Sequence, residues 1–160
     1  MRLVFSFIAF FCLVCCNPKG EDYRIFFDNN SDLTLRWDWG EQYPQDSLYC
    51  VSHIKSSTWR VSPHTATALS WGTEKSISWL NSFMQGKEYL SFYFFDDSVV
   101  NKSPQQEIVD NYCILVRYDF TRENLETELE WQISFPPSER MSKVHMWPPY
   151  DEVVALYGNN

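Results

Sequence analysis

The chain has 160 residues, and its 13 Lys and Arg against 21 Asp and Glu give a formal net charge of −8 at pH 7. An acidic chain offers no basic face that could release counterions from phosphate groups, so its charge disfavours nucleic acid and anionic lipid headgroups as partners. The length suits one domain with a single hydrophobic core.

The first residues have the pattern of a secretory signal. Met1 and Arg2 give a short positive start, and residues 3–16 are an apolar run broken only by Ser6. This run of 14 residues is shorter than the roughly 20 that a membrane-spanning helix needs, but it fits the apolar region of a signal peptide. We therefore expect residues 1–15 to be a lipoprotein signal peptide.

The end of the apolar run predicts a lipid attachment site. Leu13-Val14-Cys15-Cys16 resembles a lipobox, in which a small residue precedes the cysteine that receives lipid. Cys16 fits better than Cys15, because lipid on Cys15 would place the bulky Val14 at the cut. Acyl chains such as palmitate on Cys16 would hold the protein to a membrane surface without spanning it. An ordinary cleaved signal or an uncleaved anchor is the alternative.

A polar segment follows the lipid acceptor. Residues 16–22 contain Pro18 and Gly20 among charged side chains, which is typical of a tether, so we expect a lipidated linker there. Removal of residues 1–15 takes away Arg2 and leaves 12 Lys and Arg against 21 acids, so the mature chain carries a charge of −9.

The first folded elements are predicted strands. Residues 33–39 alternate apolar and polar side chains without a fault, which predicts a half-buried strand. Residues 23–27 are rich in strand formers, and residues 28–32 have the Asn, Asp and Ser of a turn. Together these segments predict a β-hairpin.

The middle of the chain mixes short strands with a helix. Strands are predicted at residues 48–54, 58–61 and 65–70. A helix is predicted from Thr73 to Gly86, with Ile77, Leu80 and Met84 along one face. Residues 89–95 are apolar on both alternating faces, which indicates a central strand covered on each side and ended by Asp96-Asp97.

The C-terminal third continues this alternation. Ser103-Pro104-Gln105-Gln106 predicts a capping box that opens a short helix. A strand at residues 113–118, a brief helix capped by Thr121 and a strand at residues 131–135 follow. We expect the segment after Pro136-Pro137 to form an extended strap, and residues 151–160 to form a flexible, loosely held tail.

These elements predict one mainly β domain over residues 23–150. The expected fold is β-sandwich-like, with two or three short inserted helices. An α+β fold with an antiparallel sheet is the alternative.

The cysteines beyond the lipid acceptor are Cys50 and Cys113. A disulfide between them and two separate buried thiols are both open, because the sequence does not show whether the Cα atoms lie within about 7 Å. Short-spaced zinc ligands and an acidic calcium loop are absent from the sequence, so we expect no metal and no other cofactor.

No catalytic residue is predicted. The sequence lacks GxSxG, HExxH, GxGxxG and P-loop patterns. His53, His64 and His145 are spread along the chain, and each is expected at the surface or in satisfied packing. An envelope hydrolase, in which a histidine meets a carboxylate or a serine in a pocket, is the third hypothesis for function.

Aromatic residues make up 18% of the chain, and all seven Trp follow the signal. Exposed aromatic rings can stack on sugars or anchor protein partners. The candidates for such stacking are Trp37, Trp39, Trp59 and Trp71. Core packing is the alternative for the first two, since they alternate with polar residues.

The C-terminal half carries a pattern of aromatic residues and prolines. The pattern consists of Tyr118-Asp119-Phe120, Leu125, Trp131-Gln132-Ile133, Phe135-Pro136-Pro137, Met141 and Met146-Trp147-Pro148-Pro149-Tyr150. Over residues 89–150 the chain resembles a family of small, uncharacterised lipoproteins from Bacteroidetes, with a weaker likeness over residues 23–48. Phe120 and Trp147 stand where that pattern has Leu and Tyr. The resemblance implies an envelope address and no known activity.

The same resemblance implies a possible modification. In such bacteria a short Asp-Ser/Thr-apolar pattern can accept O-linked glycan, and Asp46-Ser47-Leu48 and Asp97-Ser98-Val99 resemble it. Ser47 and Ser98 are therefore candidate glycosylation sites. The alternative is that these residues form turns at strand ends.

The sequence thus predicts a membrane-anchored cell-envelope lipoprotein with lipid on Cys16. We expect it at the outer membrane, facing either the periplasm or the cell surface. The leading hypothesis is a noncatalytic protein-interaction or assembly module that binds an envelope protein. The second is a carbohydrate-binding surface lipoprotein.

Overall fold

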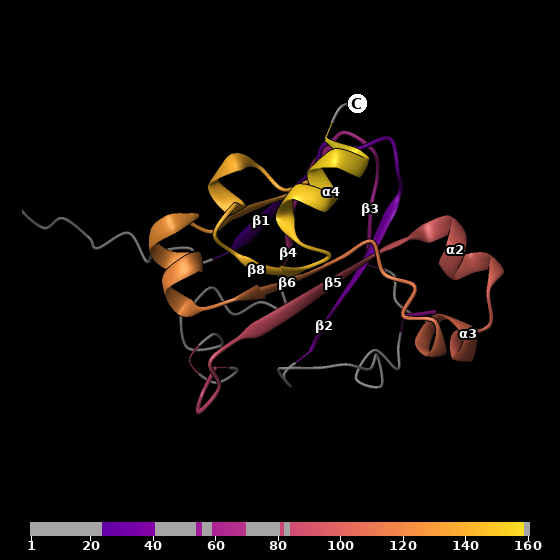
Figure 1. Ribbon diagram of the computed structural model, residues 1–160, viewed down its shortest axis with the longest axis horizontal. Helices are drawn as coiled ribbons and strands as arrows, with labels where there is room; N and C mark the ends of the chain where they lie inside the picture. Colours follow the sequence, from indigo (N-terminus) through magenta and orange to yellow (C-terminus); the bar gives the residue numbers. More distant parts are fainter. Residues whose placement is uncertain (1–23, 41–53, 56–58, 70–80, 82–83, 159–160) are drawn as a thin grey trace, which may run out of the picture.

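The computed structural model describes residues 24–40, 54–55, 59–69, 81 and 84–158. Within these ranges the chain forms eight strands in two sheets, connected in part by short helices (Figure 1). The prediction of a mainly β domain with short inserted helices is confirmed. No helix in the described ranges has both the length and the apolar character that a membrane crossing requires.

The smaller sheet, sheet A, has three strands in the order β4-β1-β7. Strand β1 (Ile25–Asn29) pairs antiparallel with β4 (Thr65–Leu69) and parallel with β7 (Gln132–Phe135). Alternate residues of β1 point to opposite faces, so Ile25 and Phe27 are buried while Phe26 is exposed.

The larger sheet, sheet B, is antiparallel throughout and has the order β3-β2-β5-β6-β8. Its strands are β3 (Arg60–Val61), β2 (Leu35–Gly40), β5 (Leu90–Asp96), β6 (Val116–Phe120) and β8 (His145–Trp147). Strand β5 lies at the centre, as its apolar sequence predicts.

The two sheets enclose the main core. The ring of Phe27 from sheet A stacks on that of Phe94 from sheet B, with centroids 4.4 Å apart. On the opposite face of β5, Tyr93 and Phe95 form a second core with residues that include Val100 and Ile108. These last two come from helices α2 (Asp97–Lys102) and α3 (Gln105–Asp110). The prediction that β5 is covered on both faces is confirmed.

The predicted β-hairpin at residues 23–39 is wrong. Strands β1 and β2 belong to different sheets, so the turn between them is a corner of the sandwich. Asn29 fixes this corner, because its buried side-chain amide donates to the carbonyls of Leu33 at 2.7 Å and Ser62 at 2.9 Å. Its Oδ1 accepts from the hydroxyl of Ser31 at 2.7 Å.

The prediction that β2 is only half-buried is also wrong. Arg36 is 2% exposed and Asp38 is 6% exposed, although both lie on the polar face of the strand. Helix α2 and residues 54–55 contribute contacts to Arg36 on that face. Segments distant in sequence thus cover a face that local alternation assigns to solvent.

Of the two helix caps predicted after residue 100, the first differs from the structure and the second is confirmed. Helix α3 begins where expected, but its N-cap is Pro104 and no side-chain cap bond forms. Thr121 does cap the next helical segment, which includes η1 (Asn124–Glu128). Its Oγ1 accepts from the Asn124 amide at 3.1 Å, while Asn124 Oδ1 accepts from the Thr121 amide at 3.0 Å.

Two other predicted elements lie mostly outside the described residues. They are the strand at residues 48–54 and the helix from Thr73 to Gly86. Gly86 itself has a φ of 72°, a left-handed backbone suited to glycine at a helix end.

The C-terminal segment is not an extended strap with a loose tail, so both predictions are wrong. The short helix η2 (Glu139–Met141) is followed by β8, which pairs with β6, and by helix α4 (Tyr150–Tyr157). Val153 is fully buried, and the Tyr157 ring lies 5.2 Å from that of Phe135. Val153 and Tyr157 are four residues apart, so they share the face of α4 that packs against the core.

Helix α4 provides a test of this docking. We expect Val153→Ala to lower the free energy of unfolding by about 2 kcal/mol, because two buried methyl groups are lost and a cavity remains. Leu156→Ala, on the same helix at 62% exposure, should change it by less than about 0.5 kcal/mol. Urea unfolding followed by Trp fluorescence measures both. Equal effects would mean that α4 does not pack as described.

Candidate functional site

Several residues singled out from the sequence lie outside the described residues. They are Cys16, Ser47, Cys50, His53 and Trp71. Lipidation of Cys16 and glycosylation of Ser47 therefore stay predictions.

The tryptophans expected to stack on a ligand differ in exposure. Trp37 is 4% exposed and its ring stacks on that of Trp59, with centroids 4.7 Å apart. Trp37 is therefore a core residue, and its prediction as a ligand-stacking residue is wrong. Trp39 is half-buried and packs against the core. Trp59 is 36% exposed and keeps part of its ring accessible.

Ser98 lies in the first turn of α2 and is exposed. The N-cap residue Asp96 accepts a hydrogen bond from the Ser98 backbone amide at 2.7 Å through its carboxylate. The alternative that this Asp-Ser segment makes a turn at a strand end is therefore supported, while glycosylation of Ser98 stays a prediction.

Cys113 is half-buried and forms no disulfide with another described residue. Its sulfur lies 4.0 Å from the backbone oxygen of Glu107. Burial, together with the charge of Glu107, raises the pKa of this thiol. A thiol with a raised pKa is a poor nucleophile at neutral pH. The disulfide with Cys50 stays a prediction.

A charged cluster ties α2 to sheet B. Arg36 Nε donates to Asp97 Oδ1 at 2.5 Å, and Arg60 Nε donates to the same oxygen at 2.8 Å. Arg36 also donates to the Ile54 carbonyl at 2.9 Å and to Asn101 Oδ1 at 2.6 Å. These contacts join β2, β3, α2 and residue 54, so the cluster has a structural role.

The electrostatics of this cluster centre on Asp97. Burial raises the pKa of its carboxyl group, but the hydrogen bonds and charges of Arg36 and Arg60 outweigh burial, and the net result is a lowered pKa. Asp97 is therefore ionised at neutral pH and neutralises the buried Arg36.

A second charged cluster lies on the outer face of sheet B, across β5, β6 and β8. Strand register places Ser91, Asp119 and His145 in one row. Asp119, at 0% exposure, accepts from the Ser91 hydroxyl at 2.6 Å and from Arg117 Nε at 3.0 Å. The Nδ1 atom of His145 lies 3.0 Å from Asp119 Oδ2.

Arg117 is the cation of this cluster. Its NH1 group donates to the Tyr112 hydroxyl at 2.9 Å. Burial lowers the pKa of Arg117, but the charges and hydrogen bonds of Asp119 and Tyr112 outweigh burial and raise it. Arg117 is therefore positively charged next to the Asp119 side chain on this face of the sheet.

The order of these side chains bears on catalysis. A hydrolytic serine donates its proton to a histidine, which a carboxylate then orients from the other side. Here Asp119 lies between the other two, because both Ser91 and His145 contact its carboxylate. Ser91 is also only 1% exposed. This arrangement does not place a nucleophile beside a base.

Above the cluster, strand β8 presents accessible side chains. His145 has a side chain that is 54% exposed, and Trp147 is 43% exposed. The Trp147 ring meets that of Tyr112 edge to face, with centroids 4.9 Å apart and an interplanar angle of 78°. We call His145, Trp147 and Tyr112 the β8 surface.

Sequence reasoning missed this cluster, although a signal was present. Arg117 and Asp119 are two residues apart, so they share one face of a strand. The expected neighbouring strand at residues 89–95 is buried on both faces. Charges next to such a strand are buried and must find partners, so the two residues could have been paired with each other.

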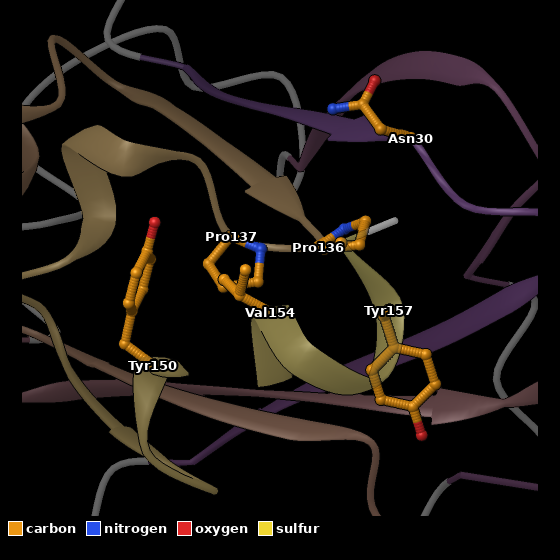
Figure 2. Close-up of a pocket in the computed structure, with 7 residues that line it drawn as sticks. Asn30, Pro136, Pro137, Tyr150, Val154 and Tyr157 are labelled. Carbon is orange, nitrogen blue, oxygen red and sulfur yellow. The ribbon is translucent and has the colours of Figure 1, made fainter. Parts of the chain in front are cut away.

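A cavity of about 210 Å³ lies between α4 and the end of β7. It is lined by Asn30, Pro136, Pro137, Tyr150, Val154, Tyr157 and Gly158. Figure 2 shows Tyr150 and Tyr157 on the two sides of the prolines. Burial and the charge of Asp96 raise the pKa of Tyr157. Ligand pockets usually measure about 300–1,000 Å³, so this cavity is small for such a role.

In the described ranges, no group of three or more His, Cys, Asp or Glu side chains could hold a metal ion. Comparisons with protein-family models, curated proteins and solved structures found no match for this chain. Function is therefore argued from the residues themselves.

Asp119 provides a test of the second cluster. We expect Asp119→Asn to lower the free energy of unfolding by about 3–5 kcal/mol, because Arg117 would be left buried without an anion. The matched control is Asp32→Asn, which removes an exposed contact with His64 and should cost less than about 1 kcal/mol. Urea unfolding measures both. A similar small loss in each variant would contradict the described network.

Asp97 provides a test by pH. Its pKa is lower in the folded state than in the unfolded chain, where it is about 3.9. The stabilisation by Asp97 is therefore complete above about pH 4 and is lost as pH falls through the lower, folded-state value. We expect Asp97→Asn to be less stable than wild type at pH 7, with a gap that narrows below about pH 4.

Urea unfolding at a series of pH values from neutral to acidic measures this gap. Ser98→Ala, a neighbour in the same turn that does not titrate, should give a difference from wild type that is independent of pH. A gap for Asp97→Asn that stays constant on acidification would contradict the assigned ion pairs.

Proposed function

We propose that this protein is a noncatalytic recognition module, held on a cell-envelope membrane by lipid on Cys16, whose β8 surface contacts a protein partner. The observation that carries the proposal is the position of Asp119, which contacts Ser91, Arg117 and His145 at once. Because Ser91 and His145 each contact Asp119, the serine is not placed beside the histidine as a nucleophile. Asp119 also fixes the strands that present the exposed side chains.

The β8 surface has the chemistry of a recognition site. Trp147 and Tyr112 combine a large apolar ring with a polar group, and such residues dominate protein interfaces. Their edge-to-face contact limits the motion of the rings before a partner arrives. A side chain that is held in place loses little conformational entropy on binding.

The geometry of the rings favours a protein partner over a glycan. Rings that stack on a chain of sugars lie in a common plane, whereas those of Trp147 and Tyr112 meet at 78°. Two rings at this angle can contact a side chain of a protein partner on two sides. Carbohydrate binding is the second candidate, supported by the exposed Trp147 with His145 nearby on the same strand.

The envelope address is supported by the sequence. The short apolar run, the lipobox-like end and the polar residues 16–22 together favour a lipoprotein with a tether. The resemblance to Bacteroidetes lipoproteins favours the outer membrane. The charge of −9 on the mature chain disfavours direct contact with anionic headgroups, so lipid is the expected membrane contact.

Site-specific photo-crosslinking in intact cells tests the β8 surface. A photoreactive residue replaces Trp147 in one variant and Leu156 in the control, and Leu156 is the more exposed of the two at 62% against 43%. We expect a discrete adduct from position 147 and none from 156. A glycosidase-sensitive adduct would instead favour carbohydrate binding, and equal adducts at both positions would exclude the β8 surface.

The anchor is tested in the same cells by labelling with an alkynyl fatty acid. Cys15→Ala should keep the label, because it leaves a small residue before Cys16, whereas Cys16→Ala should lose it. Persistent labelling of Cys16→Ala would exclude Cys16 as the acceptor. This result is independent of the crosslinking result, so the two parts of the proposal can fail separately.

A further inference from the structure

Among the described residues, strand β4 is an edge strand of sheet A with one unpaired side. In extended backbone, the amide and carbonyl groups of successive residues point to opposite sides of the strand. The amides of Phe26 and Asn30 donate toward β7, to Trp131 at 2.8 Å and Phe135 at 2.7 Å. The intervening residues of β1, such as Phe27, therefore pair with β4.

This alternation fixes the direction of the backbone groups of β4. Phe27 lies opposite Thr67, so Thr67 exchanges hydrogen bonds with β1. The backbone groups of Ala66 and Ala68 then point away from β1, toward the outside of the sheet. Among the described residues, no strand pairs with this side of β4.

The other edge of sheet A is covered. On β7, the amide of Gln132 donates to the Leu129 carbonyl at 2.9 Å, and that of Ser134 contacts the sulfur of Met141 at 3.3 Å. The β7 edge is therefore covered by nearby residues of the same chain. On the described β4 edge, the backbone groups of Ala66 and Ala68 can pair with a further strand.

Natural edge strands are usually protected by charged side chains, proline or a bulge. Strand β4 has the sequence Thr-Ala-Thr-Ala-Leu, with no charge and no proline, and it pairs with β1 residue by residue without a bulge. Its β-branched threonines favour extended structure. The edge is thus suited to pairing.

We propose that a second copy of this chain pairs with β4 along this edge, antiparallel, about a two-fold axis at Thr67. In this register Ala66 of one copy lies opposite Ala68 of the other, and each pair exchanges two backbone hydrogen bonds. The two Thr67 residues face each other on the axis. Sheet A then continues through both copies as a single six-stranded sheet.

The sequence of β4 favours its own copy as the occupant. Alanines lie at the two positions on either side of Thr67, so the central three residues are the same in both directions. An antiparallel copy therefore places Ala66 opposite Ala68, Thr67 opposite Thr67 and Thr65 opposite Leu69. The central Thr–Thr cross-strand pair is favourable. An unrelated peptide would need to match this alternation by chance.

The register also avoids charge repulsion. Asp28 lies opposite Ala66 on the outer face, and the next residues in that row are Ala68 and Phe26 of the second copy. No like charges are opposed.

Disulfide trapping in the full chain tests this register. Residues opposed in a pair without direct hydrogen bonds have Cα atoms about 4.5 Å apart, within the range that a disulfide spans. Thr67→Cys should therefore give a disulfide-linked homodimer on mild oxidation in membranes. In Thr65→Cys the two cysteines would lie about 13 Å apart along the strands and should not link.

The control is stringent, because Thr65 is exposed while Thr67 is half-buried, so random collisions would favour Thr65→Cys. The wild-type chain sets the background from its native cysteines. Adding Ala66→Lys and Ala68→Lys should abolish the Thr67→Cys dimer by placing charges at the edge. Gln132→Lys, exposed on β7 of the same sheet, should leave it intact.

Each other outcome overturns the proposal. A Thr67→Cys chain that stays monomeric excludes the edge as a contact between copies. Equal yields of disulfide-linked homodimer from Thr65→Cys and Thr67→Cys would exclude the proposed register between the two β4 strands. A Thr67→Cys adduct with a different protein would show that the edge binds a strand from another chain.

Discussion

The outer face of sheet B is largely buried, and this constraint determines what its charged residues can do. A charge removed from water without a partner costs several kcal/mol. Arg36 is satisfied by Asp97, Asn101 and backbone carbonyls, including that of Ile54. Arg117 is satisfied by Asp119 and Tyr112. The first cluster links α2 to the sheet, and the second links β8 to it through the contact of His145 with Asp119. Both links therefore involve a carboxylate that also contacts a buried arginine.

The same constraint limits the chemistry that this face can perform. Asp119 contacts Ser91, Arg117 and His145. Its carboxylate accepts the hydrogen bond of Ser91 directly, so it does not orient a histidine that could activate the serine. What remains accessible is His145 and Trp147 on edge strand β8, with the ring of the half-buried Tyr112 against that of Trp147. Preorganised side chains with a rigid supporting layer serve recognition well. The buried network therefore connects the fold to the proposed function without any catalytic step.

Local sequence patterns predicted the parts of the fold that depend on neighbouring residues. Residues 89–95 are apolar on both faces, and β5 is central; Thr121 was expected to cap a helix, and it does. Alternation fixes which face a side chain occupies, but it does not identify the neighbouring strand. The hairpin between β1 and β2 was therefore wrong, as was the exposure of Arg36, which is contacted by Asp97, a residue 61 positions away. The sequence pattern did not predict helix α4, because its apolar face is only a few residues wide.

The two edges described here differ in the kind of recognition they support. The β8 surface acts through side chains, which can distinguish one partner from another, whereas the β4 edge acts through backbone groups that any extended strand could satisfy. Specificity at β4 must therefore come from the symmetric alternation around Thr67 and from the absence of charge. Because β4 and β8 belong to different sheets, pairing through β4 leaves β8 accessible. A pair of copies would then present two β8 surfaces, and a partner that engages both would be held more tightly than either surface could hold it alone.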